Sequence, residues 1–107
     1  MTISLESIVV ELILKGGDAK GKAIEAIREA KVGNFIVAEK KLEEANESLV
    51  KAHEFQTKLL QEEASRDSAT EISLLLIHGQ DHLMNAITTK DLANEIVDLC
   101  KLIYNNK

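Results

Sequence analysis

The stretch AEKKLEEANESLVKAHEFQTKL, residues 38–59, decides the fold through the spacing of its apolar side chains. Small and apolar residues, with one glutamine among them, recur at alternating intervals of four and three: Ala38, Leu42, Ala45, Leu49, Ala52, Gln56 and Leu59. This spacing places them in one seam along a helix, as in a coiled coil. We therefore predict a helix from about Phe35 to Glu63, on which the small alanines let a neighbouring helix approach closely.

A further helix is predicted on each side of this one, because apolar residues again lie three and four apart. The first spans about Ser4 to Lys31. It is expected to be kinked or split at the glycine pair Gly16 and Gly17, with Asp18 capping the part that follows.

Residues that favour turns mark the boundaries between these helices. Gly33 and Asn34 provide a stop for the first helix and an N-cap for the second. The polar stretch ASRDSAT, residues 64–70, predicts a loop, and the third helix follows from about Glu71 to Tyr104. Three long helices with short connections predict an all-α protein, an antiparallel three-helix bundle.

The composition fits one helical domain over residues 1–107. The chain has 107 residues and no proline, so no residue in it is an obligatory breaker of a helix interior. Its small size makes oligomerisation a natural source of extra stability. The net charge of −5 disfavours nucleic-acid binding, which requires a positive field.

The expected location is the cytoplasm. Glu6 and Glu11 interrupt the apolar residues near the N-terminus and no basic region precedes them, so this segment does not resemble a signal peptide. No apolar run is long enough for insertion into a membrane. The single cysteine, Cys100, suits a reducing compartment, and its apolar helical surroundings indicate a buried, inert thiol.

The segment LLLIHGQDHLM, residues 74–84, carries the candidate functional residues. His78, Asp81 and His82 lie at positions i, i+3 and i+4, so they share one helix face within about one turn. Gln80 points roughly the opposite way, toward a different neighbour. The residues alone leave three interpretations of this cluster open.

The simplest interpretation is a group of polar residues at a helix surface or partly satisfied within the bundle. A second is a zinc site, because H-x-x-D-H has the ligand spacing of the inverted zincin pattern, with His53 as the one other histidine. A third makes one histidine a phosphoryl carrier, since neutral imidazole is a nucleophile near pH 7. His82 would then donate to the phosphoryl oxygens, whereas Asp81 would repel them unless a cation or proton neutralised it.

Three blocks, in order over nearly the whole chain, carry a family resemblance: GGDAKGKAIEAIREAKVGNF at 16–35, AHEFQTKLLQEEA at 52–64 and IHGQDHLMNAI at 77–87. They resemble the enzyme IIA component of the lactose/cellobiose-type sugar phosphotransferase system of bacteria. The third block is similar to the family's V-H-A-Q-D-H-L-M-T-A-type signature, with Gly79 in place of alanine and Asn85 in place of threonine. Gly79 is expected to cost about 0.5–1 kcal/mol of helix stability relative to alanine, without removing a functional side chain.

The resemblance implies a homotrimer of three-helix subunits in which His78 is the phosphorylated residue, the phosphohistidine. His78 would accept the group from phospho-HPr, the phosphocarrier protein, and pass it to the sugar-specific IIB component, with His82 and Gln80 in support. It also implies that Asp81 lies at the trimer axis, where three copies hold one divalent cation, Mg²⁺. The cation would neutralise the carboxylates and answer the objection raised by their charge.

The function that follows from the resemblance is support for the uptake and phosphorylation of a β-linked disaccharide. The identity of the sugar is left undetermined among lactose, cellobiose, chitobiose and related β-glucosides. In this family it is the IIB component and the membrane component IIC, which imports the sugar, that set the specificity. The alternative, from a different class, is a non-catalytic helical module that docks partner proteins.

Overall fold

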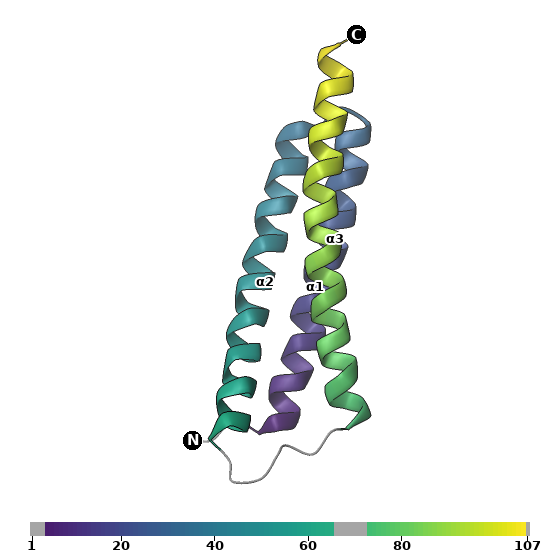
Figure 1. Ribbon diagram of the computed structural model, residues 1–107. Coiled ribbons are helices and arrows are strands. Elements are labelled where there is room, and N and C mark those ends of the chain that lie inside the picture. The colour runs from purple at the N-terminus through teal and green to yellow at the C-terminus, as the bar shows by residue number, and fades with distance from the viewer. Residues whose placement is uncertain (1–3, 66–72, 107) are drawn as a thin grey trace.

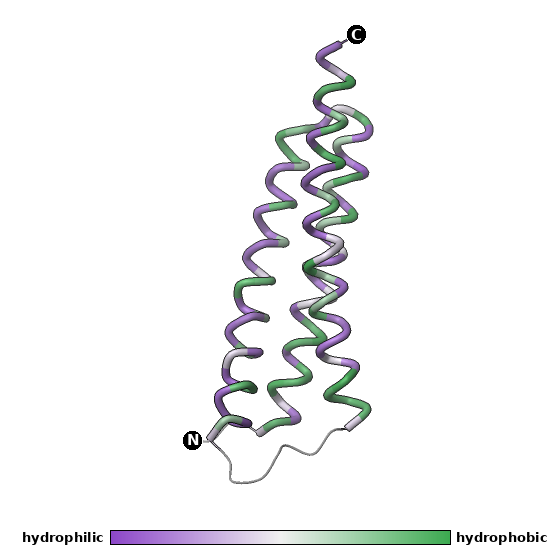
Figure 2. The backbone as a smooth tube through the Cα atoms, viewed as in Figure 1, coloured by the Kyte–Doolittle hydropathy of each residue, from purple (hydrophilic) through white to green (hydrophobic). Residues whose placement is uncertain are grey.

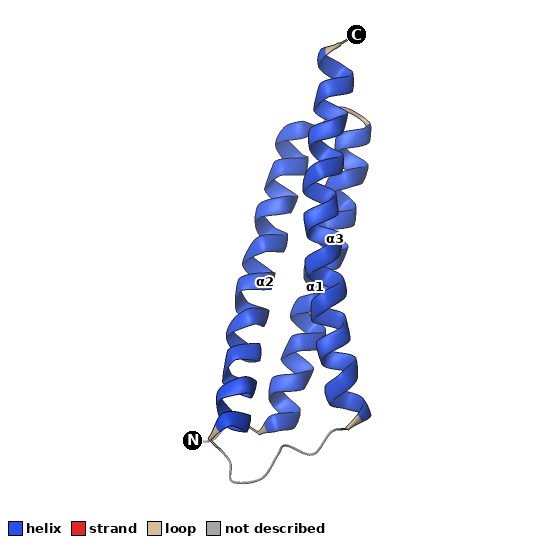
Figure 3. Ribbon diagram, viewed as in Figure 1, coloured by secondary structure: helices blue, strands red, loops and turns tan. Residues whose placement is uncertain are grey.

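The computed structural model describes residues 4–65 and 73–106, which form three long helices (Figure 1). They are α1 (Leu5–Lys31), α2 (Phe35–Ala64) and α3 (Leu74–Asn105). Every regular element within these ranges is a helix (Figure 3), so the predicted all-α class is confirmed. The turn between α1 and α2 lies at one end of the bundle, and the end of α2 and the start of α3 lie at the other (Figure 1).

The glycine pair Gly16 and Gly17 lies inside a continuous helix, so the helix is not split there, which was one of the two predicted outcomes. Gly16 belongs to the buried stripe of α1 and packs against the backbone of α3, and this tertiary packing stabilises the helix where glycine alone would weaken it. Asp18 is consequently an interior residue of α1 and not a cap. Its carboxylate forms an ion pair with Lys22, one turn further on, at 3.2 Å.

The turn between α1 and α2 depends on Gly33, as predicted. This residue has φ of 84°, in the left-handed region that favours glycine. The N–H groups of Gly33 and Asn34 donate to the carbonyls of Ala30 and Glu29, which closes the end of α1. Asn34 takes the N-cap position of α2, as predicted, but its side chain forms no capping bond: its amide donates to the Glu29 carboxylate at 2.8 Å.

The core follows the seam predicted for α2. The six apolar members of that seam are buried and Gln56 is half-buried. The buried face of α1 is also rich in alanine, which allows the two backbones to approach closely: Ala19, Ala23, Ala26 and Ala30. α1 packs extensively against both other helices, whereas α2 and α3 touch each other much less.

The described ends of α2 and α3 lie within a few residues of the ends predicted from the sequence. α2 ends at Ala64, one residue beyond its predicted end. α3 begins at Leu74 after its N-cap Ser73. The remainder of the predicted loop at 66–70 and the predicted helix start at Glu71 lie outside the described residues.

Polar side chains link α2 to both of its neighbours. The Ser48 hydroxyl donates to the Asp18 carboxylate, and this bond, helped by Lys22, holds the pKa of that carboxyl below its ordinary value of 3.8. Among the described residues, three ion pairs add further links: Lys41 with Glu25 of α1, Lys22 of α1 with Glu44, and Lys101 of α3 with Glu39. Since both members of each pair are partly exposed, these links contribute little to stability individually.

Hydrophilic and hydrophobic residues alternate along each helix (Figure 2), and α3 has large apolar side chains exposed to solvent. Several large ones are more than half exposed: Leu74, Ile77, Met84, Leu92, Leu99 and Leu102. Exposed apolar residues recurring along one long helix are typical of an interaction surface. None of the helices in residues 4–65 and 73–106 is both long enough and apolar enough to cross a membrane.

Candidate functional site

The candidate residues lie in the first three turns of α3. The Ser73 hydroxyl accepts the N–H of Leu76 at 3.1 Å and so fixes where the helix begins. Gly79 and Leu83 form the buried side of this segment, toward α1. The polar side chains at 78, 80, 81 and 82 therefore project from the remaining faces.

His78 and His82 form a side-chain pair. Their ring centroids lie 4.5 Å apart with the ring planes at 82°, an edge-to-face arrangement. His78 is exposed and His82 is half-buried. Within the described part of the chain neither ring forms a hydrogen bond or an ion pair. The shared face predicted from the i, i+4 spacing is thus present, and both rings keep nitrogen atoms available for chemistry.

Gln80 lies on the side of α3 that meets α2. Its Oε1 accepts a hydrogen bond from Nε2 of Gln56 at 3.0 Å, in a partly buried position. The expectation that Gln80 meets a different neighbour from the histidines is confirmed. Within one chain the structure therefore brings His78 and His82 together and directs Gln80 elsewhere.

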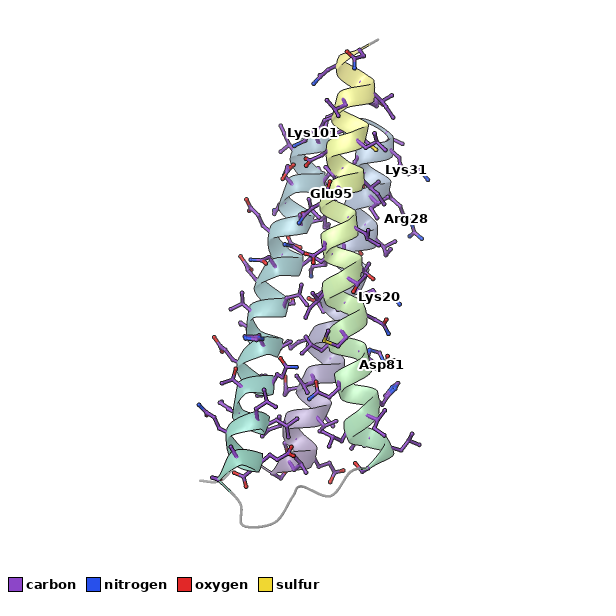
Figure 4. All side chains as sticks on the ribbon, in the orientation of Figure 1. Lys20, Arg28, Lys31, Asp81, Glu95 and Lys101 are labelled. Atoms are coloured by element: carbon purple, nitrogen blue, oxygen red, sulfur yellow. The ribbon has the colours of Figure 1, made fainter. Side chains whose placement is uncertain are left out.

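Asp81 is exposed at the outer edge of α3, on the side turned away from α2 (Figure 4). One turn before it lies Ile77 and nearly one turn after it Met84, each 55% exposed. Its carboxylate forms no ion pair or hydrogen bond with the other described residues. An unpaired carboxylate thus interrupts a stripe of exposed apolar side chains.

Two glycines bring α1 close to the histidine-bearing turns, and the sequence analysis missed this role. A Cβ atom at Gly16 would lie 3.2 Å from the backbone oxygen of His82. One at Gly79 would lie 2.8 Å from Cγ1 of Val9. The signal was present in the sequence, because Gly16 continues the buried spacing of Val9 and Leu12 along α1.

An open groove of about 460 Å³ lies beside His78 and is lined by that residue, Leu74 and Leu75. Figure 2 shows the apolar start of α3 at the end of the bundle where α1 also begins. Small-molecule sites are usually enclosed clefts, whereas an open apolar surface suits contact with another protein. The imidazole of His78 stands at the edge of such a surface.

The zinc interpretation requires ligands beyond the two histidines. Residues 4–65 and 73–106 contain no group of three or more His, Cys, Asp or Glu side chains arranged to hold a metal ion. His53 projects from the exposed face of α2. One chain therefore offers a pair of imidazoles and not a three-ligand zinc centre.

These features define an all-helical protein with a pair of imidazoles beside an open apolar surface. Residues 7–101 match the family model described as the PTS system, lactose/cellobiose-specific IIA subunit. The chain belongs to this family of phosphotransferase-system IIA subunits.

Known relatives cover almost the full chain. It is 48% identical over 107 residues to the lichenan-specific phosphotransferase enzyme IIA component of Bacillus subtilis, covering 100% of this chain and 96% of that protein. The crystal structure of the cellobiose-specific enzyme IIA from Bacillus anthracis superposes with a TM-score of 0.91 at 45% identity, covering 99% and 97% of the two chains. The IIA(chitobiose)–HPr complex of the Escherichia coli N,N'-diacetylchitobiose branch gives 0.80 at 31% identity, covering 96% and 99%.

Proposed function

We propose that this chain accepts a phosphoryl group from phospho-HPr on His78 and passes it to its cognate IIB component. This transfer would support the uptake and phosphorylation of a β-linked disaccharide. The observation that carries the proposal is the exposed His78 ring, paired with His82 and bordered by an apolar groove, in a member of the IIA family. A structural relative was solved as a IIA–HPr complex, which supports HPr as the donor.

The transfer needs a nucleophile that is exposed to partner proteins and that forms a bond to phosphorus that can be broken again. The lone pair on a ring nitrogen of neutral His78 forms the bond to phosphorus while the bond between phosphorus and the donor's imidazole breaks. The electron pair of the broken bond returns to the donor ring. Transfer onward to IIB repeats the exchange in the opposite role, so the group is carried without a change of oxidation state.

His82 and Gln80 are proposed as supporting residues in different ways. The His82 ring, 4.5 Å from His78 between centroids, is near enough to donate an N–H to the phosphoryl oxygens. Gln80 is held toward α2 by Gln56, so its amide faces away from His78 of its own chain. Any support from Gln80 would therefore reach His78 of an adjacent subunit.

We further propose that three copies assemble as a homotrimer through the exposed apolar side of α3. The large side chains left on this surface support the assembly, because a single chain does not bury them. Asp81 would face the threefold axis and hold one Mg²⁺ with its two counterparts. The residue fits this role, since its carboxylate is exposed, has no partner in the described chain and supplies the oxygen donor that Mg²⁺ prefers.

The test is phosphoryl labelling by phosphoenolpyruvate with enzyme I and HPr. His78→Ala is expected to abolish labelling, and His53→Ala, which alters an exposed histidine on α2, is expected to label like the wild type. The label should be stable in alkali and labile in acid, as a phosphohistidine is. Full labelling of His78→Ala would show that the carrier residue is wrong.

The alternative, a helical module that only docks partners, predicts no phosphohistidine in the wild type under any transfer condition. The sugar is to be assigned from the cognate IIB and IIC components. Relatives are named for lichenan, cellobiose and N,N'-diacetylchitobiose, which supports a β-linked substrate class.

A further inference from the structure

The two imidazoles on α3 are placed as a chelating pair. His78 and His82 are four residues apart on one helix, the spacing at which two histidines bind a single zinc ion in helix-borne metal sites. The rings already meet edge to face with their centroids 4.5 Å apart, and rotation of both side chains can direct one nitrogen of each ring toward a shared ion at the usual Zn–N distance of about 2.0–2.1 Å. Neutral imidazole is a favoured ligand for Zn²⁺, Ni²⁺ and Cu²⁺.

The surroundings leave both rings free to bind an ion. Neither ring is engaged by a hydrogen bond or an ion pair within residues 4–65 and 73–106, so metal binding has to break neither kind of bond. Between them in sequence, Gly79 has no side chain and Gln80 is turned toward α2 by Gln56.

We propose that His78 and His82 bind one Zn²⁺ per chain and that this ion blocks phosphorylation of His78. The inhibitory part of the proposal rests on the proposed carrier function. A neutral imidazole has one ring nitrogen with a free lone pair and one that carries a hydrogen. Zinc bound through that lone pair leaves the His78 ring without a nucleophile to attack phosphorus, so the ion must leave before the ring accepts the phosphoryl group, and no redox step is involved.

The site differs from the three-ligand zinc centre of a hydrolase. The described residues supply no third protein ligand, so water completes the coordination shell. A site with two protein ligands binds more weakly than a structural zinc centre, and a chelator such as EDTA removes the ion. This reversibility is what an inhibitory ion at a carrier residue requires.

Binding is tested by titrating metal-free protein with zinc chloride in a calorimeter. We expect one Zn²⁺ per chain, loss of this binding in His78→Ala, His82→Ala and the bulkier His82→Gln, and retention in His53→Ala. The control removes the third histidine of the chain and leaves the pair intact. Binding that persists in both His82 variants would overturn the proposal, as would a stoichiometry of one per three chains that Asp81→Asn abolishes.

Inhibition is tested with HPr that has been phosphorylated and separated from enzyme I. Zinc should reduce the rate of His78 labelling in the wild type, and EDTA should restore it. In His82→Gln the labelling rate, compared with its own metal-free rate, should be insensitive to zinc. Zinc binding that leaves wild-type labelling unchanged would overturn the block, whereas absence of labelling without zinc would instead contradict the carrier function.

Discussion

The packing of Gly79 against Val9 predicts that Gly79→Ala destabilises this chain, although alanine is the better helix former. The new Cβ would lie 2.8 Å from Cγ1 of Val9 and 3.4 Å from its carbonyl oxygen. Val9 is buried and β-branched, so in a helix it has essentially one side-chain rotamer and cannot turn away. Either α1 or the first turns of α3 must shift.

Two opposing terms set the magnitude. Overpacking a well-filled core costs about 1–3 kcal/mol. Replacing a helical glycine by alanine contributes about 1 kcal/mol in the opposite direction. We therefore expect the free energy of unfolding to fall by about 1 kcal/mol, with about 2 kcal/mol as the upper end. The stability advantage of alanine over glycine that helix propensity predicts at this position is therefore expected only if the residue facing it is smaller than valine.

The assay is urea unfolding followed by circular dichroism, at one fixed chain concentration because assembly affects apparent stability. Val9→Ala removes the clashing methyl, so Gly79→Ala made in that background should stabilise by about 1 kcal/mol. Gly21→Ala is the matched control, since Gly21 is exposed within α1 with no atom near its Cβ position, and it should also stabilise by about 1 kcal/mol. If Gly79→Ala stabilises equally in both Val9 backgrounds, the close contact does not constrain the helices.

Three further perturbations test other parts of the structure. Gly33→Ala should lower the melting temperature by several degrees. The alanine would carry about 1–2 kcal/mol of strain in the left-handed backbone conformation, and its Cβ would lie 2.8 Å from the Tyr104 ring. An unchanged melting temperature would contradict this. Ser48→Ala removes the main hydrogen bond that depresses the pKa of Asp18, and it should lower the free energy of unfolding by less than about 1 kcal/mol, because the carboxylate is largely exposed. This loss should be present above pH 3.8 and should disappear at lower pH, once Asp18 is protonated in both the folded and the unfolded state. A loss of the same size at pH 7 and pH 3 in urea unfolding would rule out that linkage. Asp81→Leu should keep or strengthen the proposed trimer, because it removes like-charge repulsion between carboxylates placed at the axis. Dissociation to monomers in sedimentation would mean that the cation is required or that the residue is not axial.

The helices were predictable because their signals are local. The four-and-three spacing from Ala38 to Leu59 determines which face of α2 is buried whatever that face packs against. Gly33 was predictable for a similar reason, since ending a helix there needs a left-handed residue and glycine adopts that conformation without strain.

The roles of other residues depend on partners distant in the sequence. Gly16 looks like a helix breaker when α1 is considered alone, yet it is a contact residue once the backbone of His82 lies against it. Asn34 occupies the predicted N-cap position, but its side-chain amide donates to the Glu29 carboxylate of α1, and the side chain forms no capping bond with α2. The spacing of His78 and His82 predicted their pairing, whereas the bond from Gln56 to Gln80 crosses between two helices and no local pattern indicates it.

The two sides of α3 have different roles, so the effect of a substitution on the proposed phosphoryl transfer can be measured apart from its effect on stability. The buried side, with Gly79 and Leu83, packs against α1, so substitutions there should change the free energy of unfolding. His78 projects from the exposed side, where substitutions typically change stability by less than about 0.5 kcal/mol. His78→Ala should therefore lose phosphoryl labelling while unfolding at the same urea concentration as the wild type. A larger stability loss would show that the ring also supports the fold. The loss of labelling could then be assigned to the missing nucleophile only after a second variant at residue 78 restored the packing and still failed to label.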